Sequence, residues 1–502
     1  MKLIDLKPFT QDRKWVVISV LLVSLALRGI LIVRGGQYYI SDETRYEVSR
    51  EAARFLSQGQ LGEAVRQFTL APEHLGFKVV GIIPALFEHI TGPSLALPAI
   101  FFSFFSVLNL YLIFLLSKRD PISSREPFYA LLIAASCLSL LYYSRHLFPY
   151  DMAMSFGLLA LYTGLRPQPD IRTTLSCGGW SFLSFITYNG YWPLAGFAML
   201  AHVLTTGKTL TAILQKALST VIGFLAPLGL LILGVRVLGT DMISEYRYFA
   251  TSITQGSFEE GWSLPFEYFW HTEHWVFLIV GLFSVYALRE IFRTHRKLTR
   301  VWAGGLIFVY LCLLISSVWL HSFVVYARLA RQLLPFLILL AASGLAQLEQ
   351  HTRARYPLAT ATLLIVVIQA AWNFGISYQF HYPRQFTEEL QAQFPGFEFS
   401  SKRMAYGAPT VCRSNSYVIE NAKYYLTAPE MTPPVKGTVL RDVQHPVNFL
   451  PYQYEGYTPE QRQEFRERPL RMRFYRVDDE FISESNPAWI SIKNCTVSED
   501  QD

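Results

Sequence analysis

The sequence is poor in charge and in cysteine. Only 16% of its 502 residues are charged, whereas about one quarter are charged in an average soluble domain, which argues against an ordinary cytosolic enzyme. The five cysteines include no Cys-x-x-Cys pair, which excludes a disulfide scaffold and a zinc ribbon. A net charge of +6 would indicate a nucleic-acid partner only if the basic residues formed one face.

Hydrophobic residues make up 51% of the chain, and they gather in long runs between residue 15 and residue 378. Runs of roughly 20 apolar residues are long enough to cross a bilayer as helices. The sequence therefore predicts an α-helical polytopic membrane protein with about eleven spans. These spans are expected at 15–33, 94–117, 127–145, 149–165, 175–188, 193–206, 217–239, 273–289, 301–320, 333–348 and 358–378.

Lysine and arginine in the short loops predict the orientation. The loops 117–126, 166–174, 206–216, 289–300 and 349–357 hold 3, 2, 2, 5 and 2 of them, 14 in total. The alternate loops 146–148, 189–192, 240–272 and 321–332 hold 0, 0, 1 and 2, only 3 in total. Because basic loops stay in the cytoplasm, we expect a cytoplasmic N-terminus and an outer C-terminus. The positive charge is thereby explained without nucleic acid.

Two segments near the N-terminus need separate interpretation. The first span carries Arg28, is long and lacks a small-residue cleavage site, so we expect an uncleaved signal anchor. Gly76–Thr91 would make a twelfth span, but that would place the basic cluster at Arg293–Arg300 outside. We expect this segment to be a juxtamembrane or partly inserted helix.

The segment 379–502 differs from the transmembrane domain, 1–378. It holds 14 basic and 17 acidic residues, which predicts a soluble extracytoplasmic α+β domain. Leu470, Met472 and Phe474 alternate with polar neighbours, the period of a half-buried strand. Cys412 and Cys495 fall in this domain; they form either a disulfide or two buried thiols.

The first outer loop, 35–93, is far longer than a connection requires. Ser41 is a suitable N-cap, Asp42 and Glu43 suit a first helical turn, and Gly59 ends the pattern. An apolar stripe predicts an amphipathic helix on the outer leaflet. The stripe consists of Val48, Ala52, Phe55 and Leu56. Simple helix capping is the alternative role for both acids.

Other charged residues lie on the same outer side. Asp151 re-enters the membrane after Pro149, where an acid is costly and functional by default, although it would also serve as an N-cap. The basic group is larger than membrane anchoring explains. It comprises Arg28, His74, Lys78, Arg145, His146, Arg328 and Arg331.

Three motifs resemble the GT-C glycosyltransferases, in particular the protein O-mannosyltransferase and aminoarabinose-transferase type. The family's loop motif of Asp-Glu followed by an aromatic residue is matched by Asp42, Glu43 and Tyr46. The segments Pro72–Gly92 and Val324–Leu345 are similar to the family's approach to the second span and to its late Tyr, Arg and Leu-Pro segment. The sequence departs from many members at His74, where they carry a His-Pro-Pro-Leu-like stretch, and 379–502 matches nothing in the family.

The resemblance implies transfer of a sugar from a polyprenyl- or dolichyl-phosphate donor to a glycan, lipid or protein acceptor on the outer side. It favours a bacterial inner membrane over the endoplasmic reticulum. The departing lipid phosphate is a stabilised anion, so one base and several cations suffice. Asp42 is the candidate base, and Asp151 is a second acid that would position the acceptor, the base or a metal. The donor phosphate would be bound by Lys78, Arg328, Arg331 and Tyr326, with Glu43, His74, Arg145 and His146 as further candidates.

The alternatives on these residues remain open. Arg328 and Arg331 would also serve as outer-leaflet lipid anchors. Asp42 and Asp151 would suit Mg²⁺ or Mn²⁺, but two acids without a fixed spacing do not define a metal site, so no cofactor is predicted. The aromatic loop 240–272 is an interfacial belt or an acceptor-binding lid. A transporter, which would show paired inverted repeats, and a membrane-anchored assembly protein are the competing functions.

Overall fold

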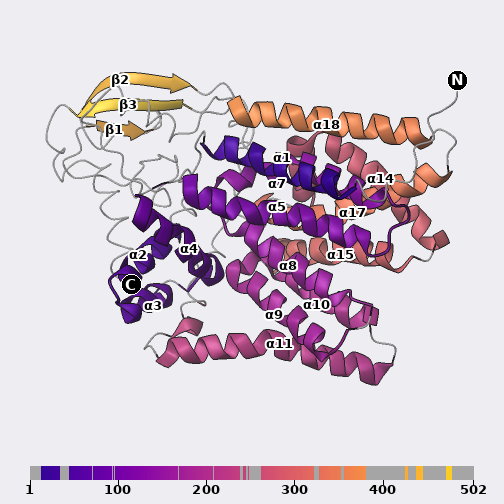
Figure 1. The fold of residues 1–502 in the computed structure, drawn as a ribbon, viewed down its shortest axis with the longest axis horizontal. Coiled ribbons are helices and arrows are strands. Elements are labelled where there is room, and N and C mark those ends of the chain that lie inside the picture. Colours follow the sequence, from indigo (N-terminus) through magenta and orange to yellow (C-terminus); the bar gives the residue numbers. More distant parts are fainter. Residues whose placement is uncertain are drawn as a thin grey trace.

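The computed structural model describes residues 13–33, 45–70, 72–92, 94, 96–167, 169–206, 209–237, 241–244, 247, 262–294, 296–320, 327–351, 355–379, 424–427, 437–444 and 471–477. Long helices form most of the described chain (Figure 1). Before the aromatic loop 240–272 they are α1 (Arg13–Val33), α2 (Arg45–Ser57), α3 (Leu61–Leu70), α4 (Leu75–Thr91), α5 (Ala96–Lys118), α6 (Glu126–Ser136), α7 (Leu138–Tyr142), η2 (Tyr143–Arg145), α8 (Tyr150–Gly164), α9 (Ile171–Thr187), η3 (Asn189–Tyr191), α10 (Trp192–Thr206) and α11 (Leu210–Val237).

The second half of the helical body begins with α13, whose residues lie largely within the aromatic loop 240–272. Its elements are α13 (Leu264–Glu273), α14 (Trp275–Thr294), α15 (Lys297–Leu314), the π-helical turn η4 (Ile315–Trp319), α16 (Ala327–Ala330), η5 (Arg331–Leu333), α17 (Leu334–His351) and α18 (Arg355–Gln379). In Figure 1, α18 and α1 run along one side of the body and α11 along the other. Helices α2, α3 and α4 gather at one end of it.

Each of the eleven predicted spans overlaps a helix of the structure. Within the described residues, five helices are long and apolar enough to cross a membrane, or six if the bent pair α6 and α7 is one span. The others expected as spans are shorter, or less apolar, than such a crossing requires. The protein is therefore a helical membrane protein, while the number of crossings remains a prediction.

The helices of the first outer loop pack on each other through a mixed polar and apolar face. Arg50 binds both carboxylate oxygens of Glu88 on α4, and the hydroxyl of Tyr46 donates to the same carboxylate. Tyr46, Ser49 and Ala53 are buried at helical spacing, whereas the predicted stripe, apart from Ala52, is only half-buried. Polar pairing with α4 therefore sets the rotation of α2, and the placement of the stripe on the outer leaflet stays a prediction.

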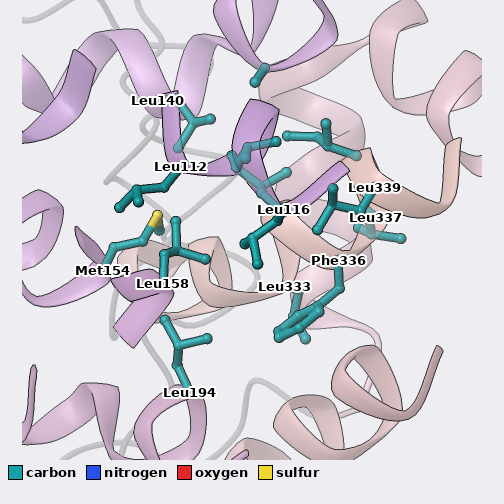
Figure 2. Packing of buried hydrophobic residues seen from close by; sticks show 14 of the residues in the cluster. Leu112, Leu116, Leu140, Met154, Leu158, Leu194, Leu333, Phe336, Leu337 and Leu339 are labelled. Carbon is teal, nitrogen blue, oxygen red and sulfur yellow. The ribbon is translucent and has the colours of Figure 1, made fainter. Parts of the chain in front are cut away.

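The helical core is built from leucine-rich faces of α5, α7, α8, α10 and α17. Figure 2 shows Leu112, Leu140, Met154 and Phe336 among the side chains that pack together there. Lipid tails are as apolar as leucine, so close packing and not water exclusion holds such helices together. A Cβ on Gly178 of α9 would lie 2.1 Å from the carbonyl oxygen of Thr220 on α11, so this crossing requires glycine.

Three strands are described in the tail. The strands β1 (Tyr424–Thr427), β3 (Arg471–Val477) and β2 (Gly437–Gln444) form one antiparallel sheet in that order. The sheet lies at the same end of the molecule as α2–α4 (Figure 1). The strand predicted from the alternation at Met472 and Phe474 is confirmed, while Cys412 and Cys495 lie outside the described residues.

Candidate functional site

A buried ion pair joins two of the predicted outer-rim residues. Arg331 begins η5, just before α17, and Asp151 lies in the first turn of α8. Nη2 of Arg331 donates to Oδ1 of Asp151 at 2.5 Å, and their side chains are 0% and 9% exposed. The carboxylate of Asp151 therefore pairs with a cation 180 residues away and is not a local N-cap, which was the alternative role.

The rest of the Arg331 guanidinium lies among tyrosines. Its Cζ stands 4.6 Å from the ring centroid of Tyr143, close enough for a cation–π contact. Tyr191 and Tyr268 also lie near enough to interact with it electrostatically. Among the described residues, Nε and Nη1 of Arg331 and the hydroxyl of Tyr191 are buried without a hydrogen-bond partner.

A chain of aromatic rings connects this ion pair to α4. Tyr143 contacts Tyr150, whose ring meets Tyr188 edge-on at 4.9 Å. Tyr188 in turn stacks on His74 at 4.7 Å. His74 is the residue before α4 and has the left-handed backbone φ of 55°, which costs a non-glycine residue free energy. A series of aromatic contacts thus runs from the predicted site residue His74 to Tyr143, whose ring contacts Arg331, the partner of Asp151.

Lys78 is fully buried on α4 and has an acidic partner. Its Nζ binds Oε1 of Glu73 at 2.6 Å, and its backbone carbonyl accepts a hydrogen bond from the Ser49 hydroxyl at 2.8 Å. Burial lowers the pKa of Lys78 to about 8, partly offset by the Glu73 carboxylate. A buried cation on a helix that also contacts α2 can bind an anion at this end of the molecule.

Three other predicted basic residues lie on or near the broken segment α7–η2. Nη2 of Arg145 donates to the carbonyl of Leu31 at 2.9 Å, and Arg145 is fully buried. The ring of His146 stacks on Phe148 at 5.1 Å. Arg28 of α1 uses all three of its nitrogen atoms, on Ser106, Ser24 and Leu140, so it ties α1 to α5 and α7.

Most of the remaining predicted site residues lie outside the described part of the chain. Asp42, Glu43 and Tyr326 lie outside the described residues, and Arg328 falls in the short helix α16. In the part of the aromatic loop that is described, Tyr268 and Phe269 are buried in the core, so neither belongs to a belt or a lid. Groups of three or more His, Cys, Asp or Glu that would hold a metal do not occur among the described residues.

Several residues of this region were not predicted. Tyr143, Tyr191 and Tyr268 surround Arg331, and Glu73 pairs with Lys78. A fifth residue, Glu273, is a buried carboxylate within α13. A buried acid in a helical membrane protein is itself a signal of function, and Glu273 lies at the end of an aromatic stretch of the sequence.

The fold of this chain is similar to that of solved structures. ArnT from Cupriavidus metallidurans bound to undecaprenyl phosphate matches with a TM-score of 0.56 at 9% identity, over 86% of this chain and 97% of that chain. The same protein in the apo state matches with a TM-score of 0.51 at 10% identity, over 93% and 98%. The chain therefore shares the fold of the two ArnT structures, as the resemblance of its motifs to the aminoarabinose-transferase type implied.

A more distant match is the archaeal oligosaccharyltransferase AglB from Archaeoglobus fulgidus, in complex with an inhibitory peptide and a dolichol-phosphate. Its TM-score is 0.43 at 13% identity, over 74% of this chain and 56% of that chain. No protein-family model and no curated protein sequence matches the chain.

Proposed function

We propose that this protein transfers a sugar from a polyprenyl-phosphate-linked donor to an acceptor on the outer side of the membrane. The likeness in fold to ArnT, which was crystallised with undecaprenyl phosphate, supports the proposal. The main supporting observation is that two nitrogen atoms of the buried Arg331 side chain have no hydrogen-bond partner among the described residues.

Arg331 contrasts with Arg28, another fully buried arginine of the same region. Arg28 donates from all three of its nitrogen atoms. Arg331 donates only from Nη2, and its two other nitrogen atoms have no partner among the described residues. An unmet buried donor costs about 1–3 kcal/mol, and more when it is charged. A phosphate oxygen would accept a hydrogen bond from either of these charged donors, and a guanidinium is well suited to binding phosphate.

Lys78 supplies a second cation, and Arg328 and Tyr326 complete the proposed phosphate site. Glu73 neutralises Lys78 at 2.6 Å, so a donor phosphate would compete with that carboxylate. Asp151 holds Arg331 by one nitrogen and leaves the other two for the ligand. We therefore assign Asp151 a positioning role and not that of the base.

An apolar cavity beside α4 suits the prenyl chain of the donor. Its volume is about 320 Å³, within the range of ligand pockets. Residues from α4, α8, α9 and α11 form its walls. Two of the lining residues, Gly76 and Val79 of α4, are near neighbours of Lys78 in the sequence. The lining comprises Leu75, Gly76, Val79, Val80, Met152, Phe156, Phe182, Leu183, Ile186, Thr187, Pro227 and Leu231.

Asp42 is the proposed general base. It precedes α2 by three residues, a reach of about 10 Å at most, and Ser49 of α2 bonds directly to the backbone of Lys78. Asp42 would take the proton of the acceptor hydroxyl as that oxygen attacks the anomeric carbon. The bond from this carbon to the phosphate oxygen breaks, and the lipid phosphate leaves as an anion that needs no general acid.

The orientation belongs to the same proposal. The 14-to-3 distribution of basic residues between alternate loops places the N-terminus in the cytoplasm. Lys78, Asp151 and Arg331 then face the outer side, together with the domain from 379 onward. A bacterial inner membrane fits a polyprenyl donor, and both hexoses and pentoses would suit the chemistry.

Two variants test the proposal on separate steps. Arg331→Gln should weaken the binding of undecaprenyl phosphate to the purified protein at least about tenfold, as expected when a charged hydrogen bond worth about 1.5–3 kcal/mol is lost. Asp42→Asn should abolish sugar transfer in a membrane assay while expression and lipid-phosphate binding survive.

The matched control is Arg125→Gln, because Arg125 is paired with Glu349 away from this site. It should bind undecaprenyl phosphate like the wild type. If the wild-type protein does not bind undecaprenyl phosphate, the proposed donor class is wrong. Full transfer by Asp42→Asn would remove Asp42 as the base.

A further inference from the structure

The span formed by α6 and α7 is broken, and the break lies beside the proposed phosphate site. The two helices bend by 67° at Cys137. The first amides of a helix have no partner within that helix, and inside a membrane no water replaces it. Something must therefore accept hydrogen bonds from the start of α7.

Glu273 supplies both acceptors from a distant part of the chain. Its Oε2 accepts from the amide of Leu138 at 2.7 Å, and its Oε1 accepts from the amide of Ser139 at 2.8 Å. The Glu273 side chain is almost fully buried. Tyr268, from the same helix α13, adds a hydrogen bond from its hydroxyl to that of Ser139 at 3.2 Å.

The segment that Glu273 holds leads directly to Arg331. The chain continues from α7 to Tyr143, whose ring lies under the guanidinium of Arg331 at 4.6 Å. The middle of α7 is held separately, because the carbonyl of Leu140 accepts from Arg28 and Ser106. Release of the first turn would therefore tilt α7 about its fixed middle and move Tyr143.

We infer that Glu273 is a positioning residue for the donor site: by binding the first two amides of α7 it keeps Tyr143 beneath Arg331 in the geometry that receives the lipid phosphate. The inference rests on the proposed function. Glu273 itself touches no substrate. Its effect passes through α7, so removal should lower affinity per folded molecule and not merely the amount of folded protein.

The test measures binding of undecaprenyl phosphate to purified, monodisperse protein in detergent by native mass spectrometry. Glu273→Ala should raise the Kd about tenfold, the lower end of the losses seen when a residue that orients a metal ligand is removed. Glu273→Gln keeps the shape but offers only one acceptor, so its Kd should fall between those of the wild type and Glu273→Ala. If Glu273→Ala fails to fold, Glu273→Gln carries the test.

A compensating change distinguishes positioning from bulk stability. Cys137 precedes α7 with the extended backbone of an N-cap, φ −71° and ψ 121°, but its side chain caps nothing. Cys137→Asp places an acceptor within reach of the Ser139 amide. Combined with Glu273→Ala, it should restore most of the lost affinity.

The matched control removes a buried carboxylate elsewhere. Glu349 accepts hydrogen bonds from Arg125 and from Tyr129, so Glu349→Ala should lower thermal stability while the Kd stays at the wild-type value. Wild-type affinity in Glu273→Ala, or in Glu273→Gln where the alanine variant does not fold, would overturn the positioning role and leave the donor site standing. A wild-type protein that binds no undecaprenyl phosphate would instead refute the proposed function.

Discussion

Replacement of Asp151 by Asn should destabilise the protein, because it leaves the guanidinium of Arg331 buried without its counter-charge. The side chain of Arg331 is 0% exposed and that of Asp151 is 9% exposed, so water cannot compensate. Removal of one partner from a buried ion pair costs about 3–5 kcal/mol. We expect Asp151→Asn to lower the free energy of unfolding by that amount.

The pairing itself is measured by a double-mutant cycle. Arg331→Gln should also destabilise, since it strands Asp151, but the double variant contains no uncompensated charge. We expect its cost to be smaller than the sum of the two single costs by about 2–3 kcal/mol, the upper range for residues in contact. The assay is denaturant unfolding in detergent micelles, followed by tryptophan fluorescence.

The pair Arg125 and Glu349 provides the control cycle. Arg125 is 36% exposed, so the coupling there should stay below about 1 kcal/mol. If the two changes at 151 and 331 are additive to within about 0.5 kcal/mol, the two side chains do not form the ion pair and Asp151 has another role. Binding of undecaprenyl phosphate should fail in the double variant even where stability is recovered, because Arg331 is absent.

Three further predictions concern α4 and the packing of α9. Burial lowers the pKa of Lys78 to about 8, so the ammonium loses its charge as the pH rises through that value. The affinity for undecaprenyl phosphate should therefore fall between pH 7 and pH 9. Lys78→Arg, which stays charged, should abolish this fall. Glu73→Gln removes the competing carboxylate and should tighten undecaprenyl phosphate binding at pH 7, whereas weaker binding would show that Glu73 orients Lys78. Gly178→Val places side-chain atoms where even a Cβ would lie 2.1 Å from the Thr220 carbonyl oxygen, so it should lower the thermal unfolding temperature. Gly229→Val should not, because a Cβ there would meet no atom within 4 Å beyond the backbone of its own helix and its chain neighbours.

The helices were predictable from sequence because membrane spans depend on local composition. Runs of apolar residues gave eleven predicted spans that each overlap a helix, although the span 127–145 is divided between α6, α7 and η2. The break at Cys137 was not predictable. Neither Gly nor Pro marks it, and the residue that stabilises it, Glu273, is 135 positions from Leu138.

The candidate site was predictable residue by residue but not as an arrangement. Asp151, Arg331 and Lys78 each stood out because charge at membrane depth is costly. Their partners depend on tertiary structure: Arg331 pairs with Asp151, while Glu73 reaches Lys78 because α4 begins only at Leu75. The packing of α2 was not predictable for the same reason, since Glu88 binds Arg50 and Tyr46 from another helix.

The buried charges of the described helical body distinguish the proposed site from the rest of the protein. Near the basic loops, Glu126 is satisfied by Arg296 and Ser343, and Glu349 by Arg125 and Tyr129. These groups hold helices together and use their carboxylates fully. Arg331 differs, because it is anchored by one carboxylate and keeps two buried donors that no described residue accepts. A stable fold tolerates unpaired buried donors where a ligand forms the missing hydrogen bonds. A guanidinium favours an anionic ligand.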